Sequence, residues 1–199
     1  YLKASAATGD VRTTLSFLRL IERMRRVIAH EYGIPLVRLA PRQTFISRIC
    51  DAAEVDWQSL HADESSVPSF HYSCVLYLST HGVDFAGGGF AFCDPAADYR
   101  LAAKGERELH RLHPEAGMAV IFSSGWENMH LVEPLHGGRR FAVPAFFETR
   151  DPARDGEQIG IFDDDVAAAE ALWRCALMPE SEADFLQTFQ RWHSLLAVG

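Results

Sequence analysis

The stretch MHLVEPLHGGRRFAVPAFF, residues 129–147, carries the most informative pattern in this chain. Gly137 and Gly138 separate two apolar runs, which is typical of two short strands joined by a tight turn. Side chains alternate between the faces of a strand, so His130 and Arg140 on such a hairpin can point into one cavity. An arginine grips a carboxylate with two parallel hydrogen bonds, whereas a lysine cannot. The stretch therefore predicts a hairpin that carries a metal-binding imidazole and a carboxylate-binding guanidinium.

A second set of candidate ligands lies upstream, in the only His-x-Asp motif of the chain, His61-Ala62-Asp63. Residues i and i+2 of a strand face the same way, so the imidazole of His61 and the carboxylate of Asp63 are expected to converge. Two histidines and one carboxylate make the ligand set of non-heme Fe(II) oxygenases, which leaves adjacent metal positions open. His61, Asp63 and His130 therefore predict an iron site. The alternative is that each histidine is a hydrogen-bonded structural residue.

The length and charge of the chain limit its class. The 199 residues suffice for one domain with a sizeable core. A net charge of −8 repels phosphate backbones, so we expect no nucleic-acid partner. We find no apolar run long enough to cross a bilayer and no signal-peptide pattern. The sequence starts at Tyr1, so we expect its N-terminus to be truncated, and both compartment and oligomeric state stay open.

The four cysteines are far apart and form no CxxC pair, so we expect them to pack as small apolar residues. Because their number is even, one or two disulfides remain an alternative. The residues are Cys50, Cys74, Cys93 and Cys175.

Hydrophobic spacing predicts helices at both ends of the chain and strands between them. Apolar residues recur every three or four positions from Val11 to about Tyr32, which indicates an amphipathic helix ended by Gly33 and Pro35. Acidic residues open helical patterns again beyond residue 160. Strands are expected at 44–49, 70–79 and 117–122 and on both sides of the glycine block at 84–92, with loops at 64–69 and 94–116. The expected organisation is a single domain over 1–199, with helical support at 10–33, a core at about 36–150 and C-terminal helices at 163–197.

His61, Asp63, His130 and Arg140, in this order on a strand-rich core, resemble the Fe(II)/2-oxoglutarate-dependent dioxygenases of the prolyl 4-hydroxylase type. That family pairs His-x-Asp with a distal His and with a Lys or Arg nine or ten residues further on. The strand around Tyr77, the glycine block and the run SSGWENMHLVE at 123–133 are also similar. The similarity extends from about residue 43 to residue 149, and it is closest to the subgroup called 2-oxoglutarate and iron-dependent oxygenase domain-containing protein 3.

The resemblance implies a mainly β fold with flanking helices, built on a double-stranded β-helix (jelly roll). It implies Fe(II) on His61, Asp63 and His130, with 2-oxoglutarate held by Arg140 and Tyr77. O2 is the third reactant, and ascorbate is a possible stimulant. The implied reaction hydroxylates a C–H bond of a prolyl or other residue in a protein or peptide and releases succinate and CO2. A noncatalytic jelly-roll binding module, an oxygenase acting on a small metabolite and a cupin-like zinc or manganese protein are the alternatives.

Two positions depart from the family pattern. Pro144 lacks the amide hydrogen of an ordinary strand residue, so its strand is expected to lie at an edge or to be bulged. A tyrosine that some relatives carry upstream of His-x-Asp is not evident here, and Trp57 is the nearest aromatic residue.

Overall fold

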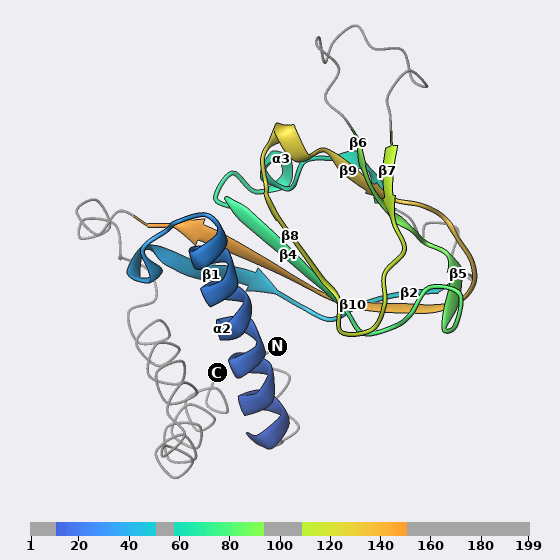
Figure 1. Ribbon diagram of the computed structural model, residues 1–199, viewed down its shortest axis with the longest axis horizontal. Helices are drawn as coiled ribbons and strands as arrows, with labels where there is room; N and C mark the ends of the chain where they lie inside the picture. Colours follow the sequence, from blue (N-terminus) through green and yellow to red (C-terminus); the bar gives the residue numbers. More distant parts are fainter. Residues whose placement is uncertain (1–10, 51–57, 94–108, 151–199) are drawn as a thin grey trace, which may run out of the picture. The chain divides into compact units, whose positions relative to one another are not determined.

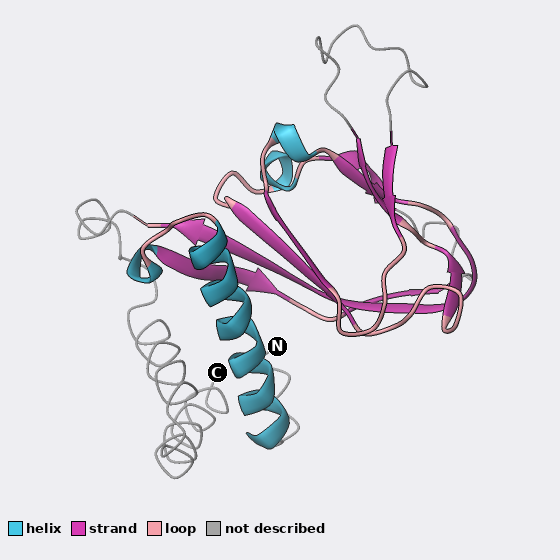
Figure 2. Cartoon of the chain, viewed as in Figure 1, coloured by secondary structure: helices cyan, strands magenta, loops and turns pink. Residues whose placement is uncertain are grey.

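The computed structural model describes residues 11–50, 58–93 and 109–150 (Figures 1 and 2). The chain divides into two compact units, one made of Tyr1–Leu39 with Arg150–Gly199 and the other of Ala40–Thr149. The helices expected at 163–197 and the aromatic candidate Trp57 lie outside the described residues. The organisation as a single domain over 1–199 stays a prediction.

The described part of the first unit is built around helix α2, Val11–Glu31. It matches the helix expected from the hydrophobic spacing, and the chain leaves it at Gly33 with a φ of 63°. Arg25 donates hydrogen bonds to the carbonyl oxygens of Leu36, in the 3-10 helix η1 (Leu36–Arg38), and of Leu39. The same guanidinium pairs with the buried carboxylate of Glu22 at 2.6 Å. No helix among the described residues is long and apolar enough to cross a membrane.

The second unit consists of two antiparallel sheets that face each other (Figure 1). One sheet has the order β1-β10-β4-β8, with β2 and β5 also paired to β10, and the other has the order β3-β9-β6-β7. These sheets confirm the predicted mainly β double-stranded β-helix. The described strands are β1 (Leu39–Thr44), β2 (Ser47–Cys50), β3 (Gln58–His61), β4 (Tyr72–Tyr77), β5 (Phe85–Gly87), β6 (Phe90–Cys93), β7 (Leu109–Leu112), β8 (Ala119–Ser123), β9 (His130–Val132) and β10 (Leu135–Thr149), with the helices α3 (Asp63–Ser66) and η2 (Trp126–Asn128).

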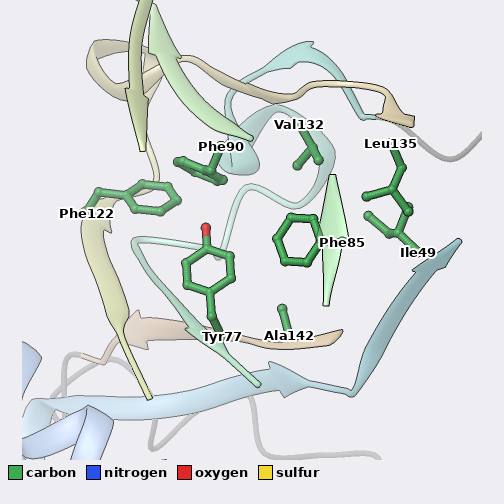
Figure 3. Close-up of a cluster of buried hydrophobic side chains, with 8 residues drawn as sticks. All are labelled: Ile49, Tyr77, Phe85, Phe90, Phe122, Val132, Leu135 and Ala142. Carbon is green, nitrogen blue, oxygen red and sulfur yellow. The ribbon is translucent and has the colours of Figure 1, made fainter. Parts of the chain in front are cut away.

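Apolar side chains fill the space between the two sheets (Figure 3). Tyr77 reaches into this cluster from β4, with its hydroxyl end directed toward Phe90 of β6. Phe122 of β8 contacts the Phe90 ring, with centroids 5.9 Å apart. One hydrophobic core therefore connects the strands that carry these aromatic residues. Its members are Ile49, Tyr77, Phe85, Phe90, Phe122, Val132, Leu135 and Ala142.

The hairpin predicted across Gly137 and Gly138 is wrong. β9 and β10 belong to different sheets, and the residues between them are Glu133 and Pro134. The two glycines lie inside β10, where a register shift between Leu135 and Gly137 adapts the strand to β5. Proline has no amide hydrogen to donate to a ladder, which favours the change of sheet at Pro134 over a tight turn three residues later.

The single strand expected at 44–49 is also divided. β1 ends at Thr44 and β2 begins at Ser47, although both pair with β10. The gap lies opposite Pro144, whose carbonyl oxygen accepts hydrogen bonds from the amide of Phe45 (3.3 Å) and the hydroxyl of Thr44 (3.0 Å). Contrary to the expectation of an edge strand, β10 is interior, and the missing amide of Pro144 interrupts its partner instead.

Two segments expected to be loops contain regular structure. Residues 63–66 form the helical turn α3, and β7 occupies 109–112 within the segment expected to be irregular at 94–116. Hydrophobic spacing does not predict either element. α3 is a single polar turn, and β7 carries the exposed side chains of His110 and Arg111.

The described cysteines pack as the sequence predicted. Cys50, Cys74 and Cys93 form no disulfide with one another, and Cys175 lies outside the described residues. Burial raises the pKa of the Cys74 thiol to about 12, which keeps it in the unreactive protonated form at neutral pH.

Replacing Gly138 by alanine is expected to destabilise the fold. A Cβ at this position would lie 2.1 Å from the carbonyl oxygen of Asp84, and the φ of 83° disfavours any L side chain. The left-handed conformation costs about 1–2 kcal/mol and overpacking adds about 1–3 kcal/mol, so we expect Gly138→Ala to lose roughly 2 kcal/mol or more of unfolding free energy. Urea denaturation followed by circular dichroism measures this loss.

Gly137→Ala is the matched control, because its Cβ would meet no atom within 4 Å and its φ is not positive. We expect that variant to stay within about 1 kcal/mol of the parent protein. Equal losses at both positions would show that backbone crowding at Gly138 does not limit stability.

Candidate metal centre

Three potential metal ligands meet where β3 pairs with β9. His61 is the last residue of β3 and lies directly opposite His130, the first residue of β9. Asp63 Oδ1 is 3.4 Å from His61 Nε2 and 3.7 Å from His130 Nε2. One ligand atom from each of the three residues lies within 4.8 Å of the others. The structure thus brings together the three residues that the sequence predicted as iron ligands.

The reason for the convergence of His61 and Asp63 differs from the one predicted. Asp63 is not on a strand but is the first residue of α3. Ala62 between them is extended, with φ −109° and ψ 140°, so the chain keeps its strand geometry for one residue beyond His61 and then turns. Ala62 is also fully buried, which fixes this corner against the core.

Both histidines are oriented by a backbone carbonyl two residues earlier in the chain. His61 Nδ1 lies 2.7 Å from the oxygen of Ser59, and His130 Nδ1 lies 2.9 Å from the oxygen of Asn128. A carbonyl oxygen only accepts hydrogen bonds, so each Nδ1 must carry the proton. In the neutral ring, the lone pair then lies on Nε2, the atom that faces Asp63. This donor set suits a divalent metal: two imidazole nitrogens and one carboxylate oxygen, each held from outside.

The charges of the three groups are coupled. The hydrogen bond to Asp63 raises the pKa of His61, whereas burial lowers the pKa of His130. Burial also acts to raise the pKa of Asp63, but hydrogen bonds from His61 and Ser73 and the charge of His130 outweigh it and hold that pKa below its ordinary value. Asp63 is therefore a carboxylate at neutral pH, and it supplies the negative charge that a divalent ion requires.

Aromatic rings enclose the centre on one side. The ring of His130 stacks on Phe90 with centroids 5.0 Å apart and meets the edge of Phe122 at 4.9 Å. His130 and Asp63 are buried, while the side chain of His61 is 24% exposed. The site is thus dry on its inner side and accessible beside His61.

Arg140 is buried in the same core with only 3% of its surface exposed. Its guanidinium carbon lies 5.1 Å from the centre of the Tyr77 ring. Arg140 Nε and the Tyr77 hydroxyl are both buried without a hydrogen-bond partner. Burial raises the pKa of Tyr77 against the opposing charge of Arg140, so the phenol stays protonated and able to donate. A buried cation and two unused donors are what an anionic ligand would satisfy.

Arg139 and Arg140 are separated as the alternation of a strand requires, because Arg139 is exposed and Arg140 is buried. A cavity of about 50 Å³ connects Arg140 to the metal-ligand cluster. Asp63 and Arg140 are the only side chains with a formal charge among the described residues that line it. The remaining lining residues are Phe45, Ser47, Ile49, Val75, Phe90, His130, Val132, Ala142, Pro144 and Phe146.

Two hydroxyl groups beside the centre were not predicted from the sequence. Ser73 donates a hydrogen bond to Asp63 Oδ2, and Ser124 bonds to Ser73. Strand alternation could have identified Ser73, since it shares a face of β4 with Val75 and Tyr77, both of which line the interior. Nothing in the local sequence marks Ser124, because it follows β8 and is brought to the site by tertiary packing.

Comparisons with known proteins agree with this geometry. The 2OG-Fe(II) oxygenase superfamily matches residues 52–148. The human protein named 2-oxoglutarate and iron-dependent oxygenase domain-containing protein 3 is 33% identical over 131 residues, which cover 63% of this chain and 38% of the relative. Prolyl 3-hydroxylase 1 of Gallus gallus is 35% identical over 116 residues, which cover 58% of this chain and 13% of that protein.

A solved structure shows the same fold. The crystal structure of an oxidoreductase of the 2OG-Fe(II) oxygenase family from Burkholderia pseudomallei aligns with a TM-score of 0.53 at 20% identity. The alignment covers 68% of this chain and 56% of that one. The chain spans well under half the length of the curated relatives it matches. Residues 52–148, which contain His61, Asp63, His130 and Arg140 in the order expected from the sequence, match the 2OG-Fe(II) oxygenase superfamily.

Proposed function

We propose that this chain is a catalytic domain that hydroxylates a C–H bond with Fe(II), 2-oxoglutarate and O2. The observation that carries the proposal is the cluster of His61, Asp63 and His130, whose ligand atoms lie within 4.8 Å of one another. The cofactors of the family are Fe(II) and 2-oxoglutarate, and both find chemically matched groups in the described residues. Bound together, they activate O2, so that one oxygen atom enters the substrate and the other enters succinate as CO2 is released.

The residues of the chain divide this task between them. His61, Asp63 and His130 hold the metal, because their donor atoms face one point and their outer atoms are fixed by hydrogen bonds. Arg140 and Tyr77 bind the far carboxylate of 2-oxoglutarate with the donors that have no partner in the protein. The rings of Phe90 and Phe122 exclude water beside His130.

We propose a residue within a protein as the substrate, with proline as the first candidate. In this proposal the two charged residues of the cavity wall, Asp63 and Arg140, bind the metal and 2-oxoglutarate. The rest of the wall is uncharged and therefore suits an uncharged group. Phe45 on this wall is 39% exposed and lies in the gap between β1 and β2, so its ring can contact a substrate from outside. A relative is named prolyl 3-hydroxylase 1. Turnover of a free small metabolite, or binding without turnover, would replace this assignment.

An anaerobic titration of metal-free protein with Fe(II) and 2-oxoglutarate tests the metal site without a known substrate. We expect the visible charge-transfer band of a keto acid chelated to iron, and we expect His130→Ala to abolish it because the metal loses one of its three protein ligands. A folded parent protein that gives no band would refute the oxygenase assignment and favour a binding module.

Arg140→Ala tests the carboxylate clamp separately from the metal. Removing one partner of a buried charge pair costs about 2 kcal/mol or more, so the dissociation constant of 2-oxoglutarate is expected to rise roughly 30-fold. Isothermal titration calorimetry on the Mn(II)-loaded protein measures this change. The neighbouring Arg139→Ala variant is the control, since that side chain is exposed on the other face of β10 and should leave the affinity unchanged.

Phe45→Asp tests the cavity wall as a substrate contact. A charge at this partly exposed position is expected to lower succinate production stimulated by a proline-containing peptide at least tenfold, while the charge-transfer band stays intact. Leu78→Asp is the control, because Leu78 is similarly exposed, at 46%, and does not line this cavity. Equal stimulation of all three proteins would exclude Phe45 from substrate binding.

A further inference from the structure

We infer that Ser73 is a positioning residue for the metal centre, which it serves by holding one oxygen of Asp63 so that the other faces the two imidazoles. The inference rests on the proposed function, because it concerns the carboxylate assigned there to the metal. Ser73 lies on β4, in the sheet of β10, whereas His61 and His130 come from the facing sheet. The hydroxyl therefore links the metal ligands across the two layers of the fold.

The geometry of the link is specific. Ser73 Oγ is 2.6 Å from Asp63 Oδ2, the carboxylate oxygen that does not face the histidines. Ser124 Oγ is 2.7 Å from Ser73 Oγ on the far side. Ser73 and Ser124 are 0% and 1% exposed, so water does not compete for these hydrogen bonds.

The direction of the two hydrogen bonds follows from the inventory of protons. Ser73 donates its single hydroxyl hydrogen to Asp63 Oδ2. Ser73 then accepts from Ser124, which must be the donor in the second bond. The chain of hydroxyls is thus polarised toward Asp63, and each bond strengthens the next.

The side chain of Asp63 depends on the hydrogen bond from Ser73, because the backbone hydrogen bonds of α3 do not orient its carboxylate. α3 is a single turn of four residues, and Ala62, at its N-cap, has no side chain that could cap the helix. Three backbone hydrogen bonds hold the turn: Ser65 N to Ala62 O at 3.1 Å, Val67 N to Asp63 O at 3.3 Å and Glu64 N to Ser124 O at 3.0 Å. Ser124 therefore anchors the turn through its carbonyl oxygen and, through Ser73, the side chain of Asp63.

The alternative is that Ser73 has only a structural role, in which its hydroxyl satisfies a buried polar group without affecting metal binding. Ser79 provides a matched comparison, because it is also a buried serine, it follows the same strand, and its hydroxyl both donates to Phe141 O (3.3 Å) and accepts from Phe141 N (2.8 Å). Ser79 makes no contact with the ligand cluster in the described structure. Loss of either hydroxyl removes two hydrogen bonds, but only the hydroxyl of Ser73 contacts a metal ligand.

Cobalt(II) binding to the metal-free protein, followed by its visible spectrum and by calorimetry, tests the inference without reference to turnover. We expect Ser73→Ala to weaken Co(II) binding about 10–100-fold, as is typical when a residue that orients a metal ligand is removed. Ser124→Ala should weaken it by a smaller factor, since Ser73 can still donate to Asp63. Ser73→Thr keeps the hydroxyl and should restore most of the affinity, whereas Ser79→Ala should bind Co(II) like the parent protein.

The outcomes separate this inference from the proposed function. If the parent protein binds Co(II) and Ser73→Ala binds it within about twofold, the positioning role is refuted and the metal site stands. The role is equally refuted if Ser79→Ala loses as much affinity as Ser73→Ala, because the loss would then reflect stability. If Ser73→Ala does not fold, the Ser124→Ala variant decides the question. An unchanged Co(II) affinity in that variant refutes a role of the linked hydroxyls in metal binding. A parent protein without Co(II) affinity overturns both proposals.

Discussion

The antiparallel pairing of β3 with β9 is the constraint on which the site depends. Opposed residues of such a pair have Cβ atoms roughly 4.5–5.5 Å apart, so the register that sets His61 against His130 also sets the distance between two ligands. Asp63 joins them only because the chain turns into α3 directly after β3. A slip of one residue would turn one imidazole to the opposite face and leave the carboxylate with a single partner. The register is fixed in turn by the core, in which Val132 of β9 packs with Phe90 of β6.

β10 supplies the second constraint from the opposite sheet. Its fifteen residues pair with β5, β2 and β4, and Arg140 itself lies opposite Ile49 of β2. The guanidinium is buried in the core, and its Nε has no hydrogen-bond partner. An unsatisfied buried cation destabilises the protein unless an anion binds. Binding of an anion to Arg140 would therefore recover free energy that the burial of its guanidinium costs.

The identity of the site residues could be predicted from the sequence, whereas their arrangement could not. His61, Asp63, His130 and Arg140 have a characteristic order and spacing, and strand alternation correctly separated Arg139 from Arg140. The hairpin was wrong because glycines inside a strand resemble a turn, and only pairing with β5 shows that they fit an irregular ladder. The bonds of Ser73 and Ser124 depend on contacts between residues 10 and 51 positions apart, which local patterns do not contain.

The interruption opposite Pro144 has a consequence for how such a site can change. β1 and β2 are each held by β10 independently, so the two residues between them, Phe45 and Ile46, belong to no ladder. Phe45 nevertheless forms part of the cavity wall. Insertions or replacements in this connection would alter this part of the cavity wall without moving the strand that carries Arg140. This part of the cavity wall and the strand that carries Arg140 are therefore separable in this fold, and Pro144, which cannot complete a ladder, is what separates them.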